Sequence, residues 1–168
     1  MKKLSADTKH KLQLVFIYLL AIVFCILWLS NKIAINNRIK QDEMSALEYA
    51  GKAANSLELY AQNGNLEMWN ESIENVGHFS AIYWNVICDR QFHKKLSRIS
   101  ATEAEMSVDI DVRTLYRLMI SDPEAVKPYA ADLSWAMRQF GDRDPFSDKN
   151  TKYIAEKLSE ILTAIKPE

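Results

Sequence analysis

The sequence predicts an all-α protein, in which a single N-terminal transmembrane helix is followed by a helical bundle of about four to six helices. An uncharged apolar segment near the N-terminus predicts the membrane helix. Apolar residues spaced three and four apart through most of the remainder predict the bundle. The charge divides in the same way: residues 1–40 hold seven Lys and Arg against one Asp, or +6, and residues 41–168 hold fourteen against twenty-one, or -7. The net charge of -1 is therefore the sum of two chemically different parts.

The transmembrane segment is expected at residues 12–31, after a basic flank at residues 1–11. No charged residue lies between Lys11 and Lys32, and residues 14–29 are apolar or aromatic without interruption. A helix of about 20 residues spans roughly 30 Å, the thickness of the hydrocarbon core of a bilayer. The alternative is a buried core helix, which usually keeps a polar edge. The residues expected in the bilayer include Leu12, Leu14, Phe16, Leu20, Phe24 and Trp28.

The basic flank also resembles the start of a cleaved signal peptide. The apolar segment is longer than a signal peptide requires, and no pair of small residues offers a cleavage site at its end. We therefore expect an uncleaved signal anchor and a single-pass protein of the cell (inner) membrane. Four Lys precede the segment, and Lys32, Arg38 and Lys40 follow it. This small positive-inside difference favours a C-terminal domain outside the cytoplasm.

A juxtamembrane helix is expected at residues 32–62, because Leu47, Ala50, Ala54, Leu57 and Ala61 lie on one helix face. No Pro or Gly lies between Ser30 and Ala50, so we expect the membrane helix to continue into this segment as one long helix. The small residues on this face permit close approach of another helix. That helix is either a second copy in a self-association seam or, as we favour, the next helix of the same chain.

The bundle domain is expected at residues 63–168 and begins with a turn at Gly64. A second helix follows, with an apolar face running from Trp69 to Ile87. Basic residues then recur at Arg90, Lys94, Lys95 and Arg98. This basic stripe is a candidate interface for nucleic acid or anionic lipid, or else a solvated helix face. Because residues 41–168 carry a charge of -7, which repels polyanions, we expect no nucleic-acid partner.

Helix starts in the C-terminal part are predicted by two capping-box patterns, Ser100 with Glu103 and Ser121 with Glu124. Between them, residues 107–113 alternate between polar and apolar. We interpret this run as an extended lead-in to the helix that carries Leu115, Tyr116 and Met119. Two further apolar faces, at residues 126–140 and 154–165, predict the last helices, with residues 141–148 as the loop between them.

Few residues point to chemistry. The four glycines are isolated, which argues against a phosphate-binding loop, and the two cysteines form neither a disulfide framework nor a CxxC pair. Glu74 and His78 are four residues apart on a helix, but a zinc site needs three or four ligands. The acidic loop lacks the Gly and Glu that a calcium loop requires. Its members are Asp142, Asp144 and Asp148. We expect no cofactor and no metal.

The hypothesis that follows is a membrane-anchored protein that acts by binding another protein, as an accessory subunit, a regulator or an immunity-type inhibitor. Self-association at the membrane is a further possibility for its partner. Aromatic residues that remain exposed are the interface candidates, because Trp and Tyr dominate binding energies at interfaces. They are Trp69, Tyr83, Trp84 and Trp135.

Two alternatives remain open. The first is a small-ligand sensor with a pocket between helices, to which His78 or Arg113 supplies polarity. The second is an enzyme that uses the carboxylates of Asp109 and Asp111. Against the enzyme, neighbouring acidic residues are also common at helix starts, where they favour the positive end of the helix dipole.

Overall fold

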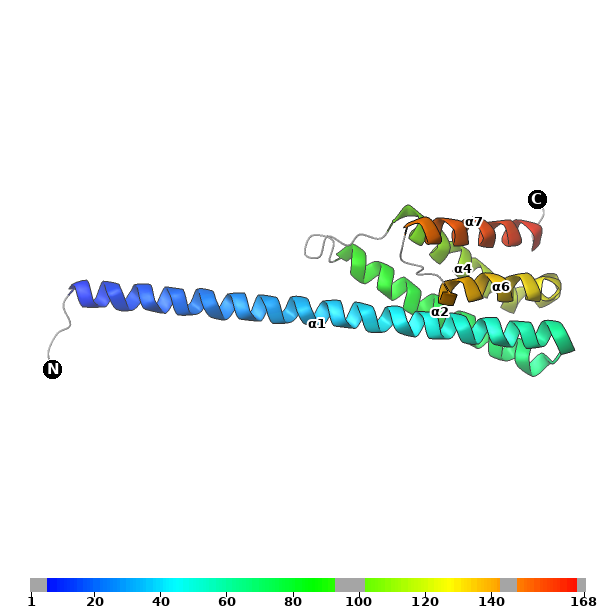
Figure 1. Ribbon diagram of the computed structural model, residues 1–168, viewed down its shortest axis with the longest axis horizontal. Helices are drawn as coiled ribbons and strands as arrows, with labels where there is room; N and C mark the ends of the chain where they lie inside the picture. Colours follow the sequence, from blue (N-terminus) through cyan, green and yellow to red (C-terminus); the bar gives the residue numbers. More distant parts are fainter. Residues whose placement is uncertain (1–5, 93–101, 143–147, 166–168) are drawn as a thin grey trace. The chain divides into compact units, whose positions relative to one another are not determined.

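The computed structural model describes residues 6–92, 102–142 and 148–165, and every regular element within these ranges is helical (Figure 1). The all-helical prediction is confirmed for this part of the chain. The elements are α1 (Ala6–Asn63), α2 (Leu66–Phe92), α4 (Glu103–Ser121), α5 (Pro123–Val126), the 3-10 helix η1 (Lys127–Tyr129), α6 (Ala130–Asp142) and α7 (Asp148–Ile165). The chain divides into two compact units, residues 1–38 and residues 39–168, and α1 contributes to both.

The first unit contains the apolar part of α1. The predicted long helix is confirmed, because α1 runs without a break from Ala6 to Asn63. Every residue from 10 to 31 is exposed, including all the large apolar side chains from Leu12 to Leu29. Among the described residues, α1 is the one helix that is long and apolar enough to cross a membrane.

In the second unit, residues 39–63 of α1 supply a seam of small side chains to the core. Ala46, Ala50, Ala53 and Ala54 are buried together with Leu57, whereas Ala61 at the end of the predicted face is exposed. The hydroxyl of Ser134 on α6 donates a hydrogen bond of 2.7 Å to the carbonyl oxygen of Ala54. Part of this seam is therefore occupied by a helix of the same chain.

The turn between α1 and α2 is built on Gly64, as predicted. Gly64 adopts a φ of 66°, in the left-handed region that favours glycine, and its N–H donates to the carbonyl of Tyr60 at 2.8 Å. The Asn65 side chain then accepts from the N–H of Glu67 at 2.9 Å, at the start of α2. Both contacts satisfy backbone groups that a helix end leaves unpaired.

The aromatic centre of the core comes from α2 and α6. The ring centroids of Phe79 and Phe140 lie 4.8 Å apart, and those of Phe79 and Tyr83 lie 5.4 Å apart. All three side chains are fully buried. On the neighbouring face of α2, a Cβ added at Gly77 would lie 2.8 Å from Cε2 of Tyr116 on α4. The absence of a side chain at Gly77 therefore lets Tyr116 pack directly against the backbone of α2.

The expected extended lead-in at residues 107–113 is wrong, because these residues belong to the regular helix α4. The alternating pattern concealed a helical one: Val108, Val112, Leu115 and Met119 are spaced four, three and four apart, and all are buried. Ile110 completed the apparent alternation, but its side chain is 57% exposed. The buried apolar residues of the alternating run, Val108 and Val112, are therefore explained by one face of a helix.

Both predicted capping boxes need correction. The capping box of α4 is formed by Thr102 and Glu105, two residues beyond the predicted pair, and Ser100 lies outside the described residues. At the second site, α5 starts after Asp122 with Pro123 in its first turn, and no side chain caps it. Ser121 is instead the last residue of α4, so its side chain cannot act as the cap.

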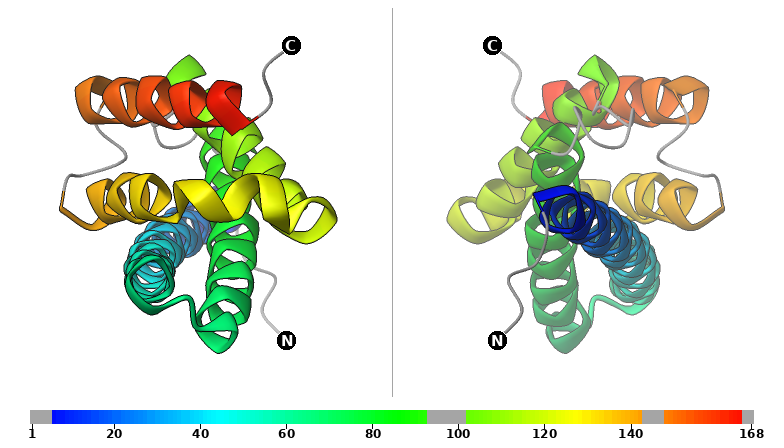
Figure 2. Two further views of the ribbon diagram at one scale, coloured as in Figure 1. Left: turned by 90° about the vertical axis from the view of Figure 1, so that its right-hand side faces the viewer. Right: turned by 90° about the vertical axis from the view of Figure 1, so that its left-hand side faces the viewer.

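The last predicted helix is confirmed as α7. The one expected at residues 126–140 is divided, because Val126 ends α5, Lys127–Tyr129 form the 3-10 helix η1, and α6 begins only at Ala130. Leu133, Met137 and Phe140 of α6 and Ile154 and Leu158 of α7 are buried in the core. Within the second unit, α4 packs against both α2 and α7, and α6 packs against α7 (Figure 2). Part of the predicted loop at residues 141–148 lies outside the described residues, and α7 begins at Asp148.

Candidate interaction surface

The most distinctive exposed side chain of the helical unit is Trp84 on α2. Its ring is 42% exposed, and the guanidinium carbon of Arg113 on α4 lies 4.4 Å from the ring centroid. This is a cation–π contact, which holds the tryptophan and the arginine in one arrangement. Trp and Arg are the residue types most enriched where binding energy is concentrated.

Asp109, one helical turn before Arg113 on α4, holds the guanidinium of Arg113 in its position beside Trp84. Its carboxylate forms an ion pair with Nη2 of Arg113, and its backbone carbonyl accepts from Nε at 3.4 Å. The Asp109 side chain is only 2% exposed. Burial raises the pKa of Asp109, and the nearby Arg113 charge works against that increase. Burial also raises the pKa of the Cys88 thiol, and the negative charge of Asp109 acts in the same direction.

The other three aromatic candidates differ in their exposure. Trp69 and Tyr83 are buried and belong to the core, and burial raises the pKa of Tyr83 far above its usual value. Trp135 on α6 is 41% exposed and lies edge-on to Tyr153, with ring centroids 6.2 Å apart. Trp84 and Trp135 are therefore the aromatic candidates that remain available to a partner.

Arg90, the first residue of the predicted basic stripe, is buried and paired. It bonds Glu43 of α1 through Nε at 3.1 Å and through Nη2, and Nη1 lies 2.6 Å from the carboxylate of Glu105 on α4. Glu105 also accepts the N–H of Thr102 at 2.6 Å in the capping box. Arg90 therefore joins three helices. The remaining stripe residues, Lys94, Lys95 and Arg98, lie outside the described residues.

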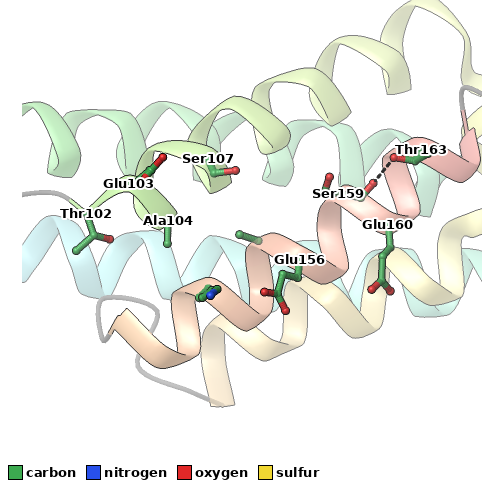
Figure 3. A pocket seen from close by; sticks show the side chains of 10 residues that line it. Thr102, Glu103, Ala104, Ser107, Glu156, Ser159, Glu160 and Thr163 are labelled. Carbon is green, nitrogen blue, oxygen red and sulfur yellow. Dashed lines mark hydrogen bonds between the residues drawn. The ribbon is translucent and has the colours of Figure 1, made fainter. Parts of the chain in front are cut away.

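An open groove of about 970 Å³ separates the first turns of α4 from α7 (Figure 3). Its lining is small and polar, with Ser107 and Ala104 on α4 facing Ser159 on α7. Three carboxylates and one lysine also line it, and Glu160 is paired with Lys157 outside the lining at 2.6 Å. The groove therefore offers hydrogen-bonding and charged groups together with apolar surface, part of it from Ala104 and Ala155.

The remaining sequence candidates do not converge into a chemical site. The Nε2 of His78 lies 3.7 Å from the Glu74 carboxylate, and its exposed ring stacks on Tyr49 at 4.8 Å between centroids. Residues 6–92, 102–142 and 148–165 contain no cluster of three metal-ligating side chains, as far as they are described. Of the acidic loop, Asp144 and the side chains of Asp142 and Asp148 lie outside the description.

Asp109 and Asp111 are in the interior of α4 and not at its start. Residues two apart on a helix do not face each other, so these carboxylates do not form a pair. Burial raises the pKa of Asp111, whose Oδ2 has no hydrogen-bond partner within the described residues. Arg113, a candidate for pocket polarity, lies beside Trp84 at the surface.

No protein-family model matches the chain, and neither a curated protein nor a solved structure was found to resemble it.

Sequence reasoning missed the part that Asp109 plays in positioning Arg113. The signal was present, since an acidic residue four positions before a basic one is a favourable helical pair. It was overlooked because the segment was interpreted as extended, where residues four apart do not meet.

Proposed function

We propose that this chain is a single-pass membrane protein whose helical unit, residues 39–168, binds another protein at the membrane surface. In this role it serves as an accessory subunit, a regulator or an immunity-type inhibitor. Anchoring confines the unit to the membrane surface and raises its effective concentration toward partners there.

The observation that carries the membrane assignment is the exposure of the apolar part of α1. Sixteen large apolar side chains between Leu12 and Ile33 are exposed. Each contributes about 2 kcal/mol when it leaves water, or on the order of 30 kcal/mol together. That exceeds the net stability of about 5–15 kcal/mol that a folded domain has. A bilayer supplies the apolar surroundings that this segment lacks within the first unit.

The charges on either side of the segment support an orientation with the N-terminus inside. Four Lys precede Leu12, whereas two Lys and one Arg lie between Asn31 and Gln41. The positive-inside rule then directs the helical unit out of the cytoplasm. A bacterial inner membrane fits this arrangement, with the unit in the periplasm.

The binding role is supported by the exposed Trp84 with its fixed Arg113. A side chain already ordered in the free protein loses less conformational entropy when a partner arrives. Asp109 and the cation–π contact provide this ordering here. The arrangement is therefore suited to contact a partner.

A photocrosslinking experiment in native membranes tests this function. A photoreactive residue replaces Trp84 in one full-length variant and Leu66, an exposed apolar residue at the start of α2, in a matched control. A topology reporter after Glu168 records the orientation in the same cells. We expect one discrete heteromeric adduct from position 84 and a reporter active only outside the cytoplasm. Crosslinks to lipid alone from every tested surface position would contradict the binding role.

A further inference from the structure

The outward face of α4 carries a row of mostly exposed side chains with the spacing of a helix-pairing interface. Its residues recur at intervals of four, three, four and three, as the core positions of paired helices do. Arg113 is half-buried against Trp84, and the other four side chains are exposed. We define the α4 seam as Met106, Ile110, Arg113, Arg117 and Ile120.

The order of residues along the α4 seam is informative. Apolar side chains stand at its ends, with Ile110 57% and Ile120 56% exposed, and the two arginines stand between them. Arg113 is engaged by Asp109 and Trp84, whereas Arg117 makes no hydrogen bond or ion pair within the described residues. A complementary surface therefore needs apolar groups at both ends and negative charge in the middle.

A second copy of the chain does not meet this requirement. An antiparallel pairing that uses the whole α4 seam places Arg113 against Arg113 and Arg117 against Ile110. A parallel pairing places each arginine against itself. Like charges in direct opposition are unfavourable at helix interfaces, and strongly so when water is excluded.

An anionic bilayer surface fits less well than a protein helix. Helices that lie on membranes have a continuous apolar face with basic residues on the polar face. Here the arginines interrupt the apolar seam. A bilayer also faces the whole unit, and residues 41–168 carry a net charge of -7, which an anionic surface repels. A single partner helix, by contrast, contacts only the α4 seam and not the acidic remainder of the unit.

We infer that the α4 seam, with Trp84 beside it, binds an amphipathic helix of a partner protein that presents carboxylates between two apolar ends. This inference rests on the proposed binding function and names the surface and the chemistry of the partner. The apolar ends cover Met106, Ile110 and Ile120, and a carboxylate reaches Arg117. Asp109 already pairs with Arg113. Arg117 is therefore the main residue by which the seam distinguishes an acidic partner from a basic one.

Two designed helical peptides test the inference on the full chain in neutral-lipid nanodiscs. Each is about 15 residues long, roughly the 22 Å of the α4 seam, with Leu at the outer seam positions. One carries Glu at the central positions and the other carries Lys. We expect saturable binding of the Glu peptide, and Arg117→Glu to weaken it about tenfold and to improve binding of the Lys peptide. Lys152→Glu makes the same charge change at an exposed residue of α7 that is not part of the seam, and is expected to have less than about a twofold effect.

Several results would overturn the inference. These are equal binding of the two peptides, no binding of either peptide, or equal effects of the Arg117 and Lys152 reversals. A dimer in sedimentation that Arg117→Glu strengthens would assign the seam to a second copy. Recruitment of anionic vesicles that Arg117→Glu abolishes would assign it to lipid. If the photocrosslinked adduct persists in Arg117→Glu while the peptides fail, the binding function stands and only this surface is wrong.

Discussion

The buried carboxylate of Glu105 offers the sharpest test of how the helical unit is held together. Glu105 is 1% exposed, receives an ion pair from Arg90 at 2.6 Å and accepts the Thr102 N–H at 2.6 Å. Glu105→Ala removes both contacts and leaves Arg90 buried with Glu43 as its remaining carboxylate. Breaking a buried pair from one side costs about 3–5 kcal/mol, whereas the Thr102 hydroxyl still caps the backbone N–H of residue 105 in this variant.

Because Glu43 still neutralises part of the Arg90 charge, we expect the low end of this range, a loss of about 3 kcal/mol in the free energy of unfolding. For a unit of this size that corresponds to a decrease of roughly 10 °C in Tm. Circular dichroism of the full chain in detergent micelles, followed through urea and thermal unfolding, measures both quantities. The control is Glu58→Ala, which removes the exposed ion pair with Arg138 and is expected to cost less than about 1 kcal/mol. Equal losses in the two variants would refute the reasoning.

Three other substitutions test the packing and its pH dependence by the same unfolding measurements. Gly77→Ala places a Cβ 2.8 Å from Cε2 of Tyr116 and should destabilise the unit by about 1–3 kcal/mol. The double variant Gly77→Ala/Tyr116→Ala should recover part of this loss. An unchanged unfolding midpoint in Gly77→Ala would contradict the close approach of Tyr116 to α2. Ser134→Ala removes the buried hydrogen bond to Ala54 and should cost about 1 kcal/mol; no loss would mean that this bond contributes nothing. Burial raises the folded-state pKa of Asp111 above its ordinary value of 3.8, so the contribution of this group to stability is full below pH 3.8 and is lost as the pH rises through the raised pKa. Asp111→Asn should therefore stabilise the unit at neutral pH, an advantage that disappears as the pH falls toward 3.8; an advantage independent of pH would contradict the burial of this charge.

Local patterns predicted the helices well wherever the apolar period was unambiguous. The face from Trp69 to Ile87 placed Tyr83 in the core, and its neighbour Trp84, about 100° around the helix, falls outside that face. Pattern reasoning failed at α4, because Ile110 made a helix resemble a strand. The exposure of Ile110 depends on which faces of α4 the neighbouring helices cover, and no local pattern contains that information.

The contacts that define the candidate surfaces are mostly not local. Arg90 looked like one cation in a solvated stripe, but its partners Glu43 and Glu105 lie 47 and 15 residues away in sequence. The contact between Arg113 and Trp84 likewise joins two helices. Only the Asp109–Arg113 pair follows from spacing within one helix, and it required the correct assignment of α4.

The central claim, that residues 12–31 anchor the helical unit in a membrane, is tested most directly by alkaline carbonate extraction of membranes that contain the full chain. The account predicts that the wild-type chain remains in the membrane pellet. It also predicts that Leu20→Arg/Phe24→Arg releases a large part of the chain, because each charge near the bilayer centre costs about 3 kcal/mol on insertion. Complete release of the wild-type chain, or equal retention of both chains, would contradict the account.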